Sequence, residues 1–212
     1  MNLEVRIPET LEEIKLKDYI QMVNLLSNSE DEHELVIKIK LASIATGLSL
    51  EDIVKIPAIE LNEIFEYVVN MLNTKPKFNP IIKVNGKEYG FIPDIESLQT
   101  SEYLDLTLYY GNDFLKTIAI LYRPVKQRIK NLYSIEEYKG LKDIEIYNEF
   151  PASAYVSCML FFYDLMNDLL KIIPQYLEEN LTEEQKAILE KNGGGISHLT
   201  NLLEEIDLNT IE

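Results

Sequence analysis

The sequence predicts a mainly helical protein of the α+β class, a helical domain with a minor β-hairpin or a small three-stranded antiparallel sheet. Three observations lead to this prediction. Apolar residues recur at helical spacing in several long segments that end at glycine or proline. One short segment alternates around an Asn-Gly pair, which is typical of a hairpin. With 212 residues, 46% of them hydrophobic, the chain is long enough to bury a core without disulfides.

The N-terminal third of the chain predicts one short strand followed by helices. Apolar and polar residues alternate over residues 2–7, as in a half-buried strand. Helical periodicity follows in three longer segments: residues 17–27, 29–47 and 61–72. The spacing of Ser29 and Glu32 is that of a capping box, so we expect the second helix to begin there and to end at Gly47. A brief helical turn should begin at Ser49.

The segment 81–91 predicts a β-hairpin. Asn85 and Gly86 supply the two positive-φ residues of a type I′ turn. In the register that this turn imposes, Lys83 faces Glu88 across the hairpin, so turn and side-chain pattern agree. Because two strands alone are only marginally stable, the apolar face should lie on the helices, and the N-terminal strand can add a third.

The second half of the chain predicts further helices on both sides of an irregular stretch. Short helices are expected over residues 94–121, separated at Gly111, with Asp113 as the N-cap of the second. Residues 125–142 show no helical period. The longest helix is expected over residues 150–173, and its apolar residues cover nearly its whole circumference, which predicts burial on several sides.

These patterns predict a core domain followed by an appendage. Residues 1–178 should form the mainly helical core domain, with the hairpin near residues 81–92. Residues 179–212 should form an acidic C-terminal helical appendage, because they combine a capping-box start with eight acidic and two basic residues.

Charge excludes several partners. The chain carries 20 Lys and Arg against 36 Asp and Glu, a net charge of −16, and such a field repels nucleic acid and anionic membranes. The single cysteine, Cys158, cannot form an internal disulfide, and the first residues lack the pattern of a signal peptide, so we expect a cytosolic origin. No membrane partner is expected.

Residues that could carry chemistry are few and scattered. His33 and His198 belong to no zinc-binding motif, and Cys158 lies in an apolar helix without a neighbouring base. Asp164 and Asp168 are one helical turn apart and could chelate a cation, although a water-facing stripe explains them better. The sequence therefore predicts no catalytic residue, no cofactor and no metal ligand.

Basic residues are concentrated in one segment. Residues 123–142 contain six basic and two acidic residues, a local charge of +4 in an acidic chain. Oppositely charged segments favour head-to-tail contacts between copies, or docking onto a charged partner. Direct contact with nucleic acid is expected only if it involves this segment. A solvated loop is the alternative interpretation, and the sequence does not decide between them.

Several short segments of the sequence together resemble a known family. They are Ile7-Pro8-Glu9-Thr10-Leu11-Glu12-Glu13-Ile14, Tyr89-Gly90-Phe91-Ile92-Pro93-Asp94, Ser101-Glu102-Tyr103-Leu104-Asp105-Leu106, Ile118-Ala119-Ile120-Leu121-Tyr122-Arg123-Pro124-Val125, Tyr133-Ser134-Ile135-Glu136-Glu137-Tyr138-Lys139-Gly140 and Phe161-Phe162-Tyr163. In this order they resemble a group of small proteins encoded among the morphogenesis genes of tailed bacteriophages, including crAss-like phages. The resemblance covers roughly residues 7–178.

The resemblance implies a non-enzymatic role in particle assembly. The expected function is a structural virion subunit of the head-to-tail or tail region, present in the host cytoplasm during assembly and then in the virion. The expected partners are other phage structural proteins in a homo- or hetero-oligomer. Basic and aromatic residues of the basic segment are the expected protein contacts: Arg123, Lys126, Arg128, Lys130, Tyr122, Tyr133 and Tyr138.

Other functions remain open at this point. A tail assembly chaperone, absent from the mature particle, would fit the same resemblance. An acidic host-directed inhibitor would fit the net charge. A metal-dependent hydrolase would have to use Asp164 and Asp168.

Overall fold

The computed structural model describes residues 6–27, 33–94, 98–130 and 132–164. It divides into two compact units, Met1–Cys158 and Met159–Glu212. The first unit contains the helices and the sheet described below. In the second unit residues 159–164 are described, and they are helical. The predicted domain boundary at residue 178 and the C-terminal appendage lie outside the described residues.

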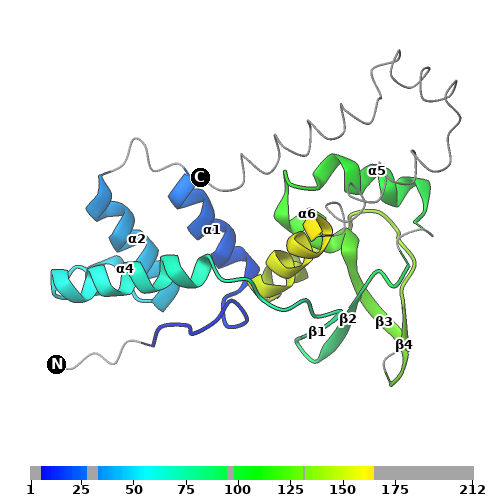
Figure 1. The fold of residues 1–212 in the computed structure, drawn as a ribbon, viewed down its shortest axis with the longest axis horizontal. Coiled ribbons are helices and arrows are strands. Elements are labelled where there is room, and N and C mark those ends of the chain that lie inside the picture. The colour runs from blue at the N-terminus through cyan, green and yellow to red at the C-terminus, as the bar shows by residue number, and fades with distance from the viewer. Residues whose placement is uncertain (1–5, 28–32, 95–97, 131, 165–212) are drawn as a thin grey trace, which may run out of the picture. The chain divides into compact units, whose positions relative to one another are not determined.

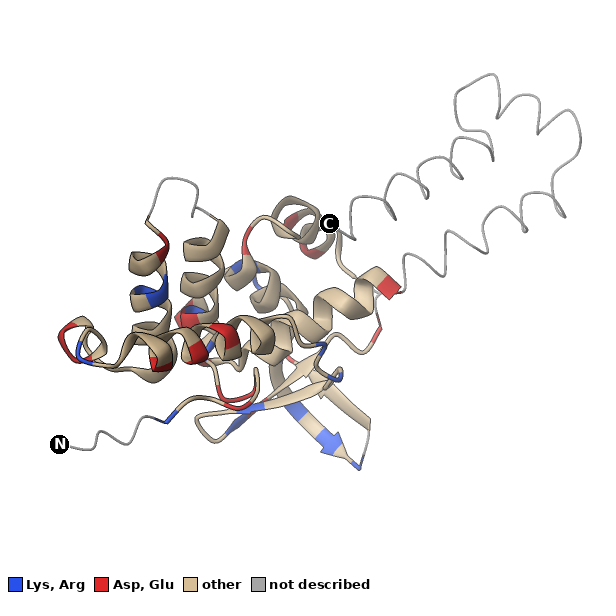
Figure 2. Cartoon of the chain, turned by 60° about the vertical axis from the view of Figure 1, so that its left-hand side comes forward, with Lys and Arg blue, Asp and Glu red and all other residues tan. Residues whose placement is uncertain are grey.

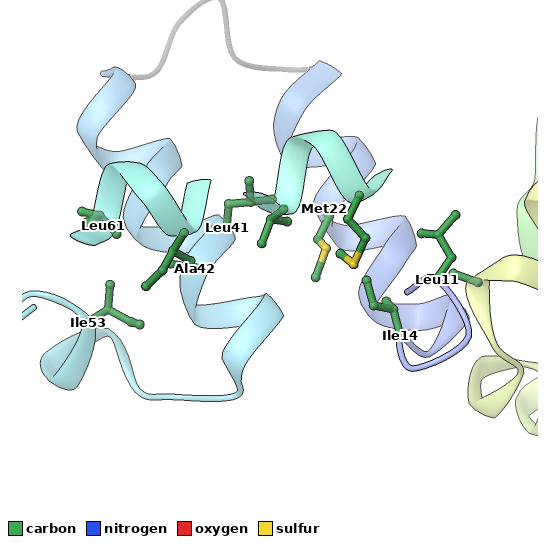
Figure 3. Packing of buried hydrophobic residues seen from close by; sticks show 11 residues of the cluster. Leu11, Ile14, Met22, Leu41, Ala42, Ile53 and Leu61 are labelled. Atoms are coloured by element: carbon green, nitrogen blue, oxygen red, sulfur yellow. The ribbon is translucent and has the colours of Figure 1, made fainter. Parts of the chain in front are cut away.

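Four N-terminal helices surround one hydrophobic cluster. They are α1 (Leu16–Ser27), α2 (Glu34–Thr46), α3 (Leu50–Ile53) and α4 (Ala58–Leu72). Figure 3 shows the buried side chains that fill the space among them: Leu11, Ile14, Met22, Leu41, Ala42, Ile53, Leu61, Ile64, Val68, Met71 and Ala152. Most of these residues recur at intervals of three or four along their helices, so helical periodicity predicted this layer. The predicted helices over residues 17–27 and 61–72 are confirmed.

The caps define where these helices begin and end. Ser49 caps α3, because its side chain accepts a hydrogen bond from the backbone N–H of Asp52, as predicted. Gly47 ends α2 with a left-handed φ of 71°, also as predicted. The N-cap of α2 is His33, whose Nδ1 accepts from the N–H of Leu35 at 3.2 Å. The predicted capping box of Ser29 and Glu32 lies outside the described residues.

A four-stranded antiparallel sheet lies beside the helices (Figure 1). Its strands follow each other in chain order: β1 (Ile81–Val84), β2 (Lys87–Phe91), β3 (Tyr122–Ile129) and β4 (Leu132–Ile135). The hairpin of β1 and β2 has the predicted register, with Lys83 opposite Glu88. Asn85 and Gly86 have the positive φ values of 48° and 81° that the predicted turn requires.

The size of the sheet corrects the predicted fold class. The prediction of a mainly α protein with a minor hairpin or a three-stranded sheet is wrong, since the protein is of the mixed α+β class with four strands. The extra pair, β3 and β4, lies within residues 122–135, most of which showed no helical periodicity. The predicted N-terminal strand is not the third strand: residues 6 and 7 are not in a strand, and residues 1–5 lie outside the described residues.

Two further helices connect the two hairpins. They are α5 (Thr100–Tyr109) and α6 (Phe114–Leu121), and Gly111 separates them with a φ of 74°. Asp113 caps α6 by accepting from the N–H of Lys116 at 3.0 Å, as predicted. Helix α6 ends at Leu121, where the predicted helical range ends, and the chain passes directly into β3 at Tyr122.

The last part of the first unit joins the sheet to the helical layer. A 3₁₀ helix, η2 (Ile144–Glu149), precedes residues 152–158, which are helical. Phe150 is fully buried among aromatic rings from β2, β3 and η2, which are Tyr89, Tyr122 and Tyr147. The long helix predicted over residues 150–173 is thus present over residues 152–164, and its remainder lies outside the described residues.

Candidate protein-contact site

The outer part of β3 and β4 forms a two-stranded ribbon. Backbone pairing of β3 with β2 covers residues 122–124, whereas residues 125–129 pair with β4. A bulge between Val125 and Gln127 marks the change. We call residues 125–130 and 132–135 the distal hairpin. Its side chains at positions 126–130, 132 and 134 are exposed and therefore available to another molecule.

The tip of the distal hairpin exposes two large apolar side chains. Ile129 and Leu132 are opposite each other in the register, and they are 74% and 79% exposed. Full burial of such a side chain stabilises a complex by about 1.5–3 kcal/mol, so an exposed pair at a ribbon tip favours contact with a partner. The sequence analysis missed both residues, since it selected basic and aromatic residues in this segment.

Three basic side chains lie on the same hairpin, close in sequence to this apolar tip. Lys126, Arg128 and Lys130 are exposed, and Figure 2 shows basic residues along β3 and at the turn that follows it. Arg128 Nη1 contacts Glu88 Oε1 of β2 at 2.8 Å, and its Nε donates to the carbonyl of Lys130 at 3.1 Å. Since exposed ion pairs contribute little to stability, these cations remain suited to an acidic partner.

Tyr133 connects the distal hairpin to strand β2. It lies opposite Arg128 on β4, yet its hydroxyl donates to the carbonyl of Phe91 on β2 at 2.7 Å. Its ring covers Gly90: a Cβ built on Gly90 would lie 2.5 Å from Tyr133 Cε2. The glycine therefore makes room for the ring, and the predicted contact residue Tyr133 is an internal support.

Arg123 is a buried structural residue. Its Nη2 lies 2.7 Å from Glu102 Oε1 of α5, and the two side chains are only 12% and 4% exposed. The geometry does not align a hydrogen bond at this contact, so charge attraction holds the pair. The ring of Tyr138 lies 5.9 Å from the guanidinium carbon. Arg123 thus joins α5 to β3 and is not offered to a partner.

The remaining predicted tyrosines are also internal. Tyr122 is fully buried, and its hydroxyl donates to the carbonyl of Asn79 at 2.6 Å. Tyr138 donates to Asp105 Oδ2 at 2.5 Å. Desolvation by burial raises the pKa of both phenols well above the usual range, so both stay protonated donors at neutral pH. The structure therefore exposes Lys126, Arg128 and Lys130 on one hairpin, whereas Arg123 and the three tyrosines are engaged in internal contacts.

An open depression adjoins Arg123 on the outer side of the sheet, with a volume of about 460 Å³. Its lining mixes cations and carboxylates, such as Lys87, Lys139, Glu136 and Glu137, and it includes no Ser, Thr, Cys or His. The mixed charges also give the depression no preference for an anion or a cation.

The other candidates for chemistry are dispersed. His33 caps a helix, and Cys158 is buried, which raises the pKa of its thiol well above the usual range and keeps it unreactive. Asp164 is exposed, while Asp168 and His198 lie outside the described residues. Within the described ranges no three His, Cys, Asp or Glu side chains are grouped so that they could hold a metal ion.

Comparisons with models of protein families, with curated proteins and with solved structures found no match to this chain. Among the residues that the structure describes, no helix has the length and apolar character needed to cross a membrane.

Proposed function

We propose that this protein is a non-enzymatic morphogenesis protein of a tailed bacteriophage, a structural subunit of the head-to-tail or tail region. Its distal hairpin would hold it to a neighbouring protein of the particle. The phage assignment rests on the short sequence segments that resemble phage morphogenesis proteins. The contact role rests on the hairpin itself.

The observation that carries the contact role is the exposed tip of the distal hairpin. Ile129 and Leu132 are exposed at the tip of the ribbon, and three exposed cations lie on the same hairpin. An apolar centre with a charged rim is the usual composition of a protein interface. The preferred partner is therefore a protein surface with an apolar centre and acidic residues around it.

Nucleic acid fits this hairpin less well. A net charge of −16 repels phosphates at long range, and the most exposed positions of the tip are aliphatic. Base and phosphate contacts need hydrogen-bond donors at those positions.

Particle composition tests the structural role. Mass spectrometry of purified particles should find this chain at a fixed copy number relative to the major capsid protein. Its absence from mature particles, with presence in assembly intermediates, would contradict the structural role and favour the tail assembly chaperone.

Charge reversal tests the hairpin. Particles should fail to assemble when the chain carries Lys126→Glu, Arg128→Glu and Lys130→Glu, while the thermal unfolding of the isolated protein changes little because all three side chains are exposed. The matched control carries Lys75→Glu, Lys77→Glu and Lys83→Glu, which alter the net charge equally at other exposed lysines. Normal assembly of the hairpin variant would refute the contact role.

A further inference from the structure

We propose that the partner of the distal hairpin is a second copy of this chain, and that the hairpin docks on an acidic surface formed by α3 and α4. We define this acidic surface by the exposed residues Leu50, Glu51, Val54, Ile59, Glu60, Glu63 and Glu66. The inference rests on the proposed function, since it specifies how one subunit of a particle would contact the next.

The two surfaces have complementary charges. Residues 125–135 contain three basic and no acidic residues, a charge of +3. Residues 50–66 contain five acidic residues and one basic residue, a charge of −4. The basic residue, Lys55, is paired with Asp52 at 2.8 Å. The cation of α2 that is nearest to α4, Lys38, is paired with Glu34 at 2.6 Å, so the outer carboxylates are left for a partner.

Both surfaces also expose large apolar side chains. Ile59 is 74% exposed at the start of α4, and Val54 and Leu50 are exposed on α3. On α4, Glu63 follows Ile59 by four positions, so an acidic and an apolar side chain share one side of the helix, and Glu60 lies about one turn before Glu63. The hairpin has a comparable composition, in which Ile129 and Leu132 are exposed beside three exposed cations. Apolar centres can therefore meet while the charged rims pair.

The positions of the two surfaces require contact between copies. Within the first unit, the distal hairpin and α4 lie on opposite sides (Figures 1 and 2). A hairpin cannot reach the acidic surface of its own chain, so the contact would be heterologous. Such contacts close into rings or continue as filaments, both of which serve a phage neck or tail.

The exposed apolar residues of α5 are less suited than the acidic surface to bind the distal hairpin. Tyr103, Leu104 and Leu108 are exposed there. The two carboxylates of α5, however, are engaged internally: Glu102 is buried against Arg123, and Asp105 accepts from Tyr138. Little charge on this helix is left to pair with the basic rim of the hairpin.

A charge-swap experiment tests the proposal on the full chain. Sedimentation velocity should show that the unmodified protein self-associates at concentrations up to about 100 µM, and that added salt weakens the association. The hairpin variant, Lys126→Glu with Lys130→Glu, and the helix variant, Glu60→Lys with Glu63→Lys, should each self-associate at least about tenfold more weakly. An equimolar mixture of the two variants should associate again, since each then supplies a complementary surface.

The control variant, Glu9→Lys with Glu12→Lys, reverses two exposed carboxylates elsewhere and should associate as the unmodified protein does. Circular dichroism and thermal unfolding establish that each variant is folded. A monomeric unmodified protein, or association that survives both reversals, would overturn the inference.

The outcomes also separate this inference from the proposed function. A chain that is monomeric in solution yet present in particles at fixed copy number would remove the inference and leave the proposed function. A chain that associates through these surfaces yet is absent from particles would leave the inference and remove the structural role.

Discussion

At the scale of single residues, Arg123 and Arg128 show that equal charge in one segment leads to different roles. Arg123 is paired with the buried Glu102 of α5, and its own side chain is only 12% exposed. Arg128, five positions later, pairs with Glu88 at the surface. The sequence predicted both as contact residues because the burial of Arg123 depends on a helix that lies elsewhere in the chain. Local charge could not reveal that partner.

The buried pair gives a first prediction. Arg123→Met should destabilise the protein by about 3–5 kcal/mol, because it leaves the carboxylate of Glu102 buried without a partner. Arg123→Met combined with Glu102→Leu should recover most of this loss. Arg128→Met, the exposed control, should change the free energy of unfolding by at most about 1 kcal/mol. Denaturant unfolding measures all three, and an unchanged midpoint for Arg123→Met would contradict the structural role of the pair.

Glu149 gives a prediction about pH. Its carboxylate accepts from Lys15 at 2.6 Å and from Lys17 at 3.2 Å, and these hydrogen bonds hold the pKa of Glu149 below its usual value of 4.5. The stabilisation is complete above the unfolded-state pKa and is lost as the pH falls through the lower folded-state pKa. The unmodified protein should therefore lose stability on acidification in that range.

Glu149→Gln should make the acid dependence of stability less steep, because the variant has no proton to take up at this position. Thermal unfolding between about pH 6 and pH 3 measures the difference. Glu12→Gln is the control at another exposed glutamate. Parallel pH curves for the unmodified protein and Glu149→Gln would show that this ion pair does not contribute.

At the scale of elements, the sequence pattern predicted helices, a cap and a hairpin that are encoded within a few residues. It missed the pairing of strands that are far apart in the sequence. The helices over residues 17–27 and 61–72, the Asp113 cap and the register of the first hairpin are all encoded within a few residues, and the structure confirms them. Strand β3 pairs with β2 about 30 residues earlier, as in Gly90 opposite Arg123. Basic residues at every second position, Lys126, Arg128 and Lys130, were the available signal for a ribbon.

The tip of the distal hairpin gives the prediction for this scale. Ile129→Thr with Leu132→Thr should change stability by less than about 1 kcal/mol, because both side chains are exposed and threonine is compatible with strands. Binding to the partner should weaken at least about tenfold, since their burial contributes more than 1.4 kcal/mol.

The matched control is Leu104→Gln with Leu108→Gln, which removes two exposed leucines from α5. Sedimentation and particle assembly should be unaffected by this control. If the α5 variant, and not the tip variant, lost its contacts, the interface would have to be reassigned to α5.

At the scale of the whole molecule, the candidate site depends on two parts of the sheet: a buried part that supports the distal hairpin, and an exposed part that can contact a partner. Phe150, Tyr147 and Tyr122 pack at the junction of sheet and helices, and the hydroxyl of Tyr147 donates to the carbonyl of Tyr122 at 2.8 Å. This junction supports the inner end of β3, while the outer end extends beyond it. The resemblance and the uneven charge predicted a protein that acts by contact, and the fold was needed to say which residues are exposed for such a contact.

Lysine labelling of assembled particles tests directly whether the distal hairpin contacts a neighbouring protein. Acetylation followed by mass spectrometry compares each lysine in the free protein and in the particle. If the distal hairpin is the contact, Lys126 and Lys130 should react in the free protein and be protected in the particle. Lys75, Lys77 and Lys83 should react equally in both. Equal labelling of Lys126 and Lys130 in the two states would contradict the claim that the distal hairpin holds this protein to its neighbours.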